Sequence, residues 1–273
     1  MSNPGFAEIS GLVRKRAGIV LTEDKAYLLE TRLGPVLARF NLGSQAELGR
    51  RLRDRPDEML ERAVVESLTT HESSFFRDQK PFDHLAQLLP KFAGLRPSAH
   101  PLRIWSAACS SGQEPYSIGM VVSDVLAGRN RRVEILATDI SGEVLARARE
   151  GLYSQFEVQR GLPIRALVKH FKQEDSRWRV SAELRSMVRF EERNLLAEIS
   201  SLGRFDAIFC RNVLIYFDAP TKSRVLDAMA RQLNPDGVLY LGGAETVLGL
   251  TDRLRPITGE RGAYGLAAKQ EAA

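Results

Sequence analysis

The chain has 273 residues, of which 44% are hydrophobic and 27% are charged, as in an ordinary soluble globular protein. No segment approaches the run of about 18 apolar residues that a membrane span requires, and residues 1–7 lack the basic and apolar regions of a signal peptide. The net charge of +5 suits nucleic acid, a membrane surface or an acidic protein, and composition does not choose among these partners.

The cysteines and histidines argue against a disulfide framework and a metal site. Cys109 and Cys210 are the two cysteines, and they stand far apart in the sequence. The four histidines are also scattered, without the spacing of zinc ligands. We therefore expect a cytoplasmic protein with reduced thiols and no metal.

The first part of the chain predicts a helical domain. Apolar residues recur at helical spacing from Phe6 to Val13, and a second such pattern covers residues 27–37. Three polar residues stand where helix N-caps are expected, namely Thr22, Ser44 and Asp57. We expect a helical domain over residues 1–76, then a linker with a short helix over residues 77–101.

The rest of the chain alternates predicted strands with predicted helices. Short apolar runs that predict strands lie at residues 102–107, 133–138, 187–191, 205–210 and 237–242, with a possible closing edge strand at 261–267. Helical patterns lie at residues 82–92, 117–126, 142–149 and 220–233. This alternation is typical of an α/β fold with a doubly wound, mostly parallel sheet, here over residues 102–273. The irregular stretch at about 154–188 predicts a small inserted antiparallel β-subdomain.

The loop after the first predicted strand is rich in small residues and runs from Ala107 to Tyr116. In open α/β sheets, ligands bind beyond the carboxyl ends of the strands. The loop contains one glycine and lacks the G-x-G-x-x-G pattern, which favours a nucleoside without a pyrophosphate. Taken alone, such a loop is more often an ordinary strand-to-helix turn.

Polar residues also follow the other predicted strands. Asp139 ends the second strand, where a carboxylate can accept hydrogen bonds from both ribose hydroxyls or can cap the next helix. Ser141 is an equally good cap, which leaves Asp139 for a ligand. Arg211 and Asn212 follow the strand at 205–210, and Tyr216 is either a core tyrosine or a site residue.

Several ordered motifs resemble the CheR-type chemotaxis receptor methyltransferases, which are protein-glutamate O-methyltransferases. The motifs span nearly the whole chain and lie at residues 69–78, 105–117, 137–140, 194–195 and 210–218. The resemblance implies a Rossmann-like methyltransferase sheet that binds S-adenosylmethionine and releases S-adenosylhomocysteine. It also implies that the partner is the cytoplasmic helical domain of methyl-accepting chemoreceptors, without nucleic acid or membrane insertion.

The resemblance also implies roles for residues at matching positions. Arg77 is expected to pair with the cofactor carboxylate, Glu114 to lie near its ammonium group, and Asp139 to bind the ribose. The pocket for adenine and methionine is expected to include Asn194, Leu195, Asn212 and Val213. Ser73 matches a hydroxyl that touches the cofactor. His71 replaces the usual asparagine, where an imidazole keeps a hydrogen-bonding group and introduces a possible pH dependence.

The expected reaction needs a positioned glutamate carboxylate. Tyr216 is the candidate for orienting it, together with a basic residue from the region before the first strand, for which Arg96 and Lys91 are candidates. The more ordinary role for each of these two cations is solvated surface charge.

A receptor-binding face is expected in the helical domain. Arg32 and Arg39 stand seven residues apart, which places them on one face of a single helix, and residues 50–55 form a second basic cluster. Some relatives also bind a receptor tail peptide through a longer, glycine-rich hairpin turn. The turn at residues 172–177 is short and has no glycine, so we expect no such tether. We expect a monomer, because no heptad pattern is visible.

Three alternatives remain at the level of sequence. An RNA or small-molecule methyltransferase would suit the positive charge, but residues 212–215 lack the N-P-P-Y type of element. A signalling module that binds the cofactor without turnover is the second alternative. A nicotinamide dehydrogenase is a distant third, because the glycine fingerprint is missing.

Overall fold

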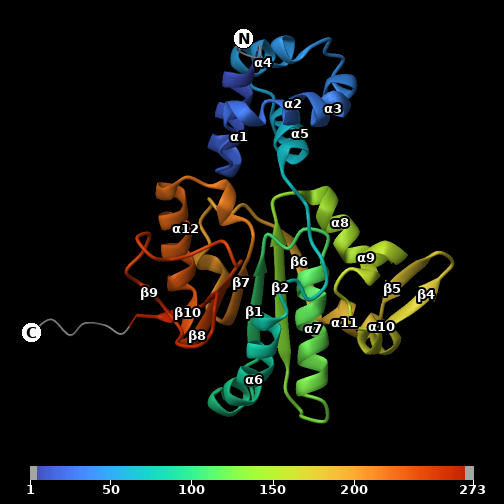
Figure 1. Ribbon diagram of the computed structural model, residues 1–273, viewed down its shortest axis with the longest axis vertical. Coiled ribbons are helices and arrows are strands. Elements are labelled where there is room, and N and C mark those ends of the chain that lie inside the picture. Colours follow the sequence, from blue (N-terminus) through green and yellow to red (C-terminus); the bar gives the residue numbers. More distant parts are fainter. Residues whose placement is uncertain (1–4, 268–273) are drawn as a thin grey trace, which may run out of the picture. The chain divides into compact units, whose positions relative to one another are not determined.

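The computed structural model describes residues 5–267, and it divides the chain into two compact units (Figure 1). The first unit contains residues 1–70 together with 216–221, and the second contains residues 71–215 together with 222–273. No helix in the described residues is both long and apolar enough to cross a membrane.

The first unit is helical, as expected. Its helices are α1 (Phe6–Ala17), α2 (Tyr27–Arg32), α3 (Gly34–Arg39), α4 (Gln45–Asp54) and α5 (Glu58–Leu68), with a 3-10 turn at Glu23–Lys25. Two predicted caps are confirmed, because the Ser44 side chain accepts a hydrogen bond from the Glu47 N–H at 3.2 Å and Asp57 accepts one from Leu60 at 3.1 Å.

The expectation of one continuous helix over residues 27–37 is wrong. The helix ends at Arg32, and α3 begins at Gly34 with Pro35 in its first turn. Proline has no N–H to donate to the preceding turn, so the chain starts a new helix there. Arg32 and Arg39 therefore lie on different helices, and their spacing no longer places them on one face. Arg32 instead donates to the Leu68 carbonyl at 3.4 Å.

The segment 216–221 belongs to the helical unit although it follows the sheet strands in sequence. Val20 donates its N–H to the Tyr216 carbonyl at 2.8 Å, and Ile19 forms an antiparallel bridge with Phe217. Arg14 of α1 also pairs with Asp218 at 2.7 Å. Backbone bonds and an ion pair thus join this segment to the N-terminal part of the chain.

The second unit is built on a seven-stranded sheet with the order β6-β2-β1-β7-β8-β10-β9. The strands are β1 (Leu102–Ala107), β2 (Val133–Asp139), β6 (Val188–Glu192), β7 (Phe205–Cys210), β8 (Leu233–Leu241), β9 (Leu254–Pro256) and β10 (Ala263–Leu266). Strands β1, β2, β6, β7 and β8 run parallel to one another. Strand β10 pairs antiparallel with both β8 and β9. The expected doubly wound sheet is confirmed, but the closing edge strand is the short β9, because β10 lies between β8 and β9.

Helices accompany this sheet, and a smaller sheet is inserted in the chain. The helices are α6 (Lys80–Leu95), α7 (Gln113–Val125), α8 (Gly142–Glu150), α11 (Ala182–Met187) and α12 (Ala219–Arg231). The inserted sheet has the order β3-β5-β4, with β3 (Leu152–Ser154), β4 (Phe171–Glu174) and β5 (Arg177–Val180) all antiparallel. Two further helices belong to the insertion, α9 (Gln155–Gln159) and α10 (Ile164–His170). The expected small antiparallel insertion is therefore present.

Candidate functional site

The carboxyl ends of the parallel strands gather polar groups at one edge of the main sheet. The loop after β1 turns sharply, because Ala108, Ser110 and Gly112 all have positive φ, at 57°, 51° and 95°. A side chain at Gly112 would lie 3.0 Å from both the Ala148 Cβ and the Tyr153 hydroxyl. This glycine is therefore required by packing within the protein.

Asp139 ends β2 and faces this loop. Its carboxylate accepts hydrogen bonds from the backbone N–H of Ser110 at 2.9 Å and of Ser141 at 3.1 Å. Ser141 caps α8, because its hydroxyl accepts a hydrogen bond from Val144 at 3.3 Å. As expected, Ser141 and not Asp139 caps the helix. Each carboxylate oxygen of Asp139 keeps a second lone pair that can accept from a ligand hydroxyl.

Glu114 lies in the first turn of α7, beside the end of β7. The Ser106 hydroxyl donates to its carboxylate at 2.7 Å, and Arg211 donates at 3.1 Å. Burial raises the pKa of Glu114, although Arg211 and the Ser106 hydroxyl both act to lower it. A ligand ammonium near this carboxylate would oppose the effect of burial.

Arg211 joins three segments around this edge. Its side chain is 2% exposed, and it donates to the Arg77 carbonyl and to the Asp78 carboxylate, both at 2.8 Å. Because the same guanidinium group also binds Glu114, it connects the segment before α6 to the start of α7. Its Nε has no hydrogen-bond partner within the described residues. The sequence singled out Arg211 as polar without assigning it a role.

The segment 71–78 is fixed by its backbone. Phe76 donates its N–H to the Ser117 hydroxyl at 3.0 Å, and the Arg77 guanidinium donates to the Glu72 carbonyl at 3.4 Å. His71 and Ser73 are half-buried in the same stretch. Arg211 therefore holds the main chain of Arg77 near the start of α7. The Asp139 carboxylate is bonded to the loop that precedes α7.

Residues after β6 reach the same edge. Arg193 donates its N–H to the Asp139 carbonyl at 2.9 Å, and the next residue, Asn194, accepts a hydrogen bond from Leu196 at 2.9 Å through its side chain. Leu195 lies between Asn194 and Leu196 in the sequence and is half-buried. The predicted pair Asn194-Leu195 thus follows directly on a residue that is bonded to Asp139.

Glu245 organises the loop after β7, and the sequence analysis missed it. One carboxylate oxygen accepts hydrogen bonds from Val213 and Leu214 at 3.0 and 2.7 Å, and the other accepts from Asn212 and Gly242 at 2.8 and 2.6 Å. These bonds hold Asn212 with a φ of 58°. An acidic residue three positions after a glycine that ends a strand was the available signal.

The donors and acceptors of this edge fit S-adenosylmethionine. Carboxylates at Asp139 and Glu114 suit a ribose diol and an ammonium group, and the half-buried Arg77 suits a carboxylate. The Ser110 hydroxyl is buried in the loop without a partner in the described residues, as a group awaiting a ligand would be. The residues present therefore fit a nucleoside that carries an amino acid.

Arg96 does not lie at this edge, and the prediction that it orients the substrate is not supported by its position. It binds Asp206 at 2.7 Å and also pairs with Asp236. Asp206 accepts a further bond from the Arg103 N–H, at the beginning of β1. Four residues of strand, about 13 Å, separate Arg103 from the end of β1. The end of α6 places Arg96 at the amino edge, as its position six residues before β1 indicates.

The other two predicted catalytic groups have different surroundings. Lys91 is exposed on α6. Tyr216 is half-buried in the segment 216–221, which belongs to the helical unit, and its carbonyl accepts the hydrogen bond from Val20. The roles predicted for these two side chains stay predictions.

Comparison with known proteins agrees with both units. A family model described as the CheR methyltransferase SAM-binding domain matches residues 71–263, and one described as the CheR methyltransferase all-alpha domain matches residues 4–69. The chain is similar to "Chemotaxis protein methyltransferase 1" of Vibrio cholerae, with 41% identity over 94% of each chain. It is also similar to the "Chemotaxis protein methyltransferase" of Escherichia coli, with 37% identity over 90% of this chain and 85% of the relative.

These matches cover nearly all of the described residues and both compact units. They agree with a site whose acidic and basic groups fit S-adenosylmethionine. The chain belongs to the CheR methyltransferase family.

Proposed function

We propose that this protein transfers the methyl group of S-adenosylmethionine to glutamate side chains of chemoreceptors, giving glutamate methyl esters. The relatives are named chemotaxis protein methyltransferases, which supports a chemotaxis substrate. The structural observation that supports the proposal is that Arg211 holds the main chain of Arg77 beside the Glu114 carboxylate. The Asp139 carboxylate is held by the loop that leads into α7.

Each of these groups receives a role in the proposal. Arg77 binds the cofactor carboxylate, Glu114 binds its ammonium group, and Asp139 accepts from the ribose hydroxyls. Asn212 and Val213, positioned by Glu245, line the adenine and methionine pocket together with Asn194 and Leu195. His71 and Ser73 complete the pocket from the segment before α6.

The chemistry asks little of the protein beyond placement. When bound, S-adenosylmethionine supplies a methyl group on a positively charged sulfur. A glutamate side chain has an ordinary pKa of about 4.3, so the carboxylate is already an anion near neutral pH and needs no general base. Alignment alone corresponds to effective molarities of about 10^5 M or more. A site with little water favours the reaction, because opposite charges are neutralised as the methyl group moves.

Tyr216 is the residue that we propose orients the receptor carboxylate. Its hydroxyl donates a hydrogen bond to the oxygen that does not attack, which leaves the other oxygen in line with the methyl group. A Tyr216→Phe variant is expected to lose turnover while its affinity for S-adenosylhomocysteine is unchanged.

The proposed partner is the cytoplasmic helical domain of methyl-accepting chemoreceptors, so the proposed location of the enzyme is the cytoplasm. We also propose that the enzyme is a monomer. The β4–β5 turn supports an enzyme that works without a receptor tail tether, because Asp175 and Ser176 alone join the two strands. Calorimetric titration with a receptor tail peptide tests this part. Clear micromolar binding would refute it.

Transfer of a labelled methyl group to purified receptor fragments tests the proposed reaction. We expect base-labile label on glutamate, because esters hydrolyse in base, whereas N-methyl groups do not. Base-stable label would indicate a different methyl acceptor. Absence of transfer to any receptor, with S-adenosylhomocysteine still bound, would indicate a cofactor-binding signalling module instead.

A further inference from the structure

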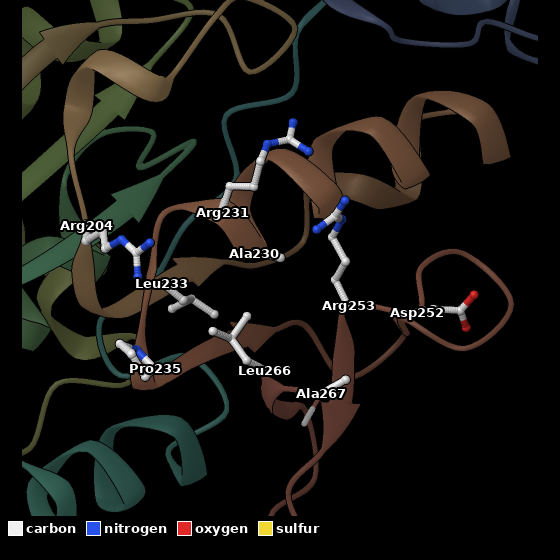
Figure 2. A pocket seen from close by; sticks show the side chains of 9 residues that line it. All are labelled: Arg204, Ala230, Arg231, Leu233, Pro235, Asp252, Arg253, Leu266 and Ala267. Carbon is white, nitrogen blue, oxygen red and sulfur yellow. The ribbon is translucent and has the colours of Figure 1, made fainter. Parts of the chain in front are cut away.

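A second pocket lies at the amino edge of the main sheet, away from the loops that carry Asp139 and Arg211. Its volume is about 890 Å³ (Figure 2). It is lined by Arg204, Ala230, Arg231, Leu233, Pro235, Asp252, Arg253, Leu266 and Ala267. Arg204 precedes β7 and Leu233 begins β8, whereas the cofactor loops follow the opposite ends of these strands. β7 alone spans roughly 17 Å between the two edges.

The wall of this pocket carries an excess of positive charge. Three arginines come from three separate segments, namely Arg204 before β7, Arg231 at the end of α12 and Arg253 before β9. One acidic residue, Asp252, also lines the pocket, and it lies within 3.8 Å of Arg255, outside the lining. In the view of Figure 2 the Asp252 carboxylate is directed away from the arginines.

Carboxylates of the protein neutralise the three guanidinium groups only in part. Within residues 5–267, neither Arg204 nor Arg231 has a carboxylate oxygen within 4 Å, and Arg253 approaches Asp227 at 3.7 Å. Arg231 lies near enough to Glu198 to help lower the pKa of that carboxyl, behind hydrogen bonds from Ser200. Exposed positive charges around a pocket raise the local concentration of anions.

The floor of the pocket is apolar. Leu266 lies between Arg204 and Arg253 in the view of Figure 2. It is half-buried, and the exposed Pro235 adds apolar surface, whereas Leu233 is fully buried. A concave apolar surface with a few charged groups at its rim is the usual form of a small-molecule site, and its volume is within the usual range. A single inorganic ion would leave this floor in contact with water.

We propose that this pocket binds a nucleoside polyphosphate, a use independent of the methyl transfer described above. Guanidinium groups present planar forks of donors that match phosphate oxygens, and they also stack on flat rings. A chain of phosphates concentrates enough negative charge to engage Arg204, Arg231 and Arg253 together. The nucleoside then covers the apolar surface of Pro235 and Leu266.

The test is calorimetric titration of the full chain with guanosine triphosphate. Saturating S-adenosylhomocysteine is present throughout, so that the cofactor pocket is occupied. Arg231→Gln and Arg253→Gln keep the length of the side chain and remove the charge. Each is expected to weaken binding about tenfold, as the loss of a charge-assisted hydrogen bond does. Raising the salt from about 0.05 M to about 0.5 M is also expected to weaken binding.

Arg129→Gln is the matched control, because Arg129 is an exposed arginine before β2 that does not line the pocket. It is expected to bind the nucleotide like the parent chain, and all variants are expected to keep their affinity for S-adenosylhomocysteine. The proposal is overturned if the nucleotide does not bind, or if Arg129→Gln weakens binding as much as Arg231→Gln and Arg253→Gln do. Inorganic pyrophosphate is expected to bind at least about tenfold more weakly than guanosine triphosphate. Equal binding of the two would overturn the proposed contact between the nucleoside and the apolar surface.

Discussion

Glu245 shows how much of a site depends on one side chain that touches no reacting atom. Its two carboxylate oxygens accept four backbone N–H groups, three of them from the consecutive residues Asn212, Val213 and Leu214. A loop of this kind cannot satisfy its own donors, because consecutive N–H groups point to the same side. The negative charge strengthens each of these bonds.

Glu245→Gln is expected to lower the free energy of unfolding by about 2 to 3 kcal/mol and to weaken S-adenosylhomocysteine binding. The amide nitrogen would face two N–H donors that it cannot accept. Urea denaturation and calorimetry measure the two effects. Glu150→Gln, on the exposed end of α8, is the control and should change neither. An unchanged free energy of unfolding for Glu245→Gln would show that the loop does not depend on the Glu245 carboxylate.

Asp139→Asn tests the ribose contact at the same scale. One oxygen becomes a donor, which removes an acceptor for a hydroxyl and opposes the N–H of Ser110 or Ser141. We expect S-adenosylhomocysteine affinity to fall about tenfold to a hundredfold. Asp175→Asn, in the exposed β4–β5 turn, serves as the control for removal of a carboxylate. An unchanged dissociation constant for Asp139→Asn would remove this residue from the pocket.

Between elements, the inserted sheet is joined to the loop after β1 by a hydrogen bond. The Tyr153 hydroxyl of β3 donates to the Ser111 carbonyl at 2.7 Å, and the ring packs edge-on against Phe75. The insertion therefore supports the loop that faces Asp139.

Tyr153→Phe is expected to cost about 1 kcal/mol of stability, the usual value of one buried hydrogen bond, and to weaken S-adenosylhomocysteine binding severalfold. Tyr116→Phe removes a similar bond, to the Ala148 carbonyl at 2.7 Å, and lies on α7 rather than on the insertion. If Tyr153→Phe and Tyr116→Phe bind S-adenosylhomocysteine equally well, the inserted sheet does not support the loop after β1.

The contact between α6 and β8 predicts acid sensitivity. Burial lowers the pKa of His84, which lies 3.0 Å from the Tyr240 hydroxyl. The unfolded chain therefore binds a proton at His84 more readily than the folded chain does. The free energy of unfolding is consequently highest above about pH 6.5 and falls as the pH decreases below that value. His84→Gln should lose less stability than the parent between pH 7.5 and 5.5, as measured by urea denaturation. His100→Gln, at an exposed position, should behave like the parent.

The elements that the sequence predicted well depend on local chemistry. The caps at Ser44 and Asp57 were correct because a short polar side chain reaches the N–H groups of its own next turn. The same holds for Ser141, which left Asp139 for the site. The break at Pro35 was missed because the apolar spacing continues across it, although the proline itself was visible.

Other features depend on which strands become neighbours. β9 has three residues, too few for an alternating pattern to be recognised. Arg96 lies six residues before β1, so the sequence already indicated the amino edge, but its partners Asp206 and Asp236 come from distant segments. Glu245 also acts on a loop more than thirty positions earlier. Such pairs become visible once the order of strands is known.

For the whole molecule, the division into units predicts where a core mutation acts. Phe217 is 7% exposed and bridges Ile19 within the helical unit, although the residues on either side of segment 216–221 belong to the sheet unit. Phe217→Ala is expected to destabilise the helical unit by about 3 to 5 kcal/mol. Hydrogen exchange measured by mass spectrometry should then rise in α1 and α5, while β1 and β7 stay protected.

Ile215→Ala is the neighbouring control, because its side chain is 47% exposed and it lies in the sheet unit. It should leave exchange in α1 unchanged. Equal loss of protection in both units after Phe217→Ala would mean that they unfold as one.

The return of residues 216–221 to the first unit has a consequence during synthesis on the ribosome. Residues 71–215 must be translated between the two parts of the helical unit. At about 5 to 20 residues per second, this takes roughly 7 to 30 seconds. The nascent N-terminal helices therefore wait with Ile19 unpaired, and a chaperone that shields apolar segments has its longest opportunity to bind in this interval.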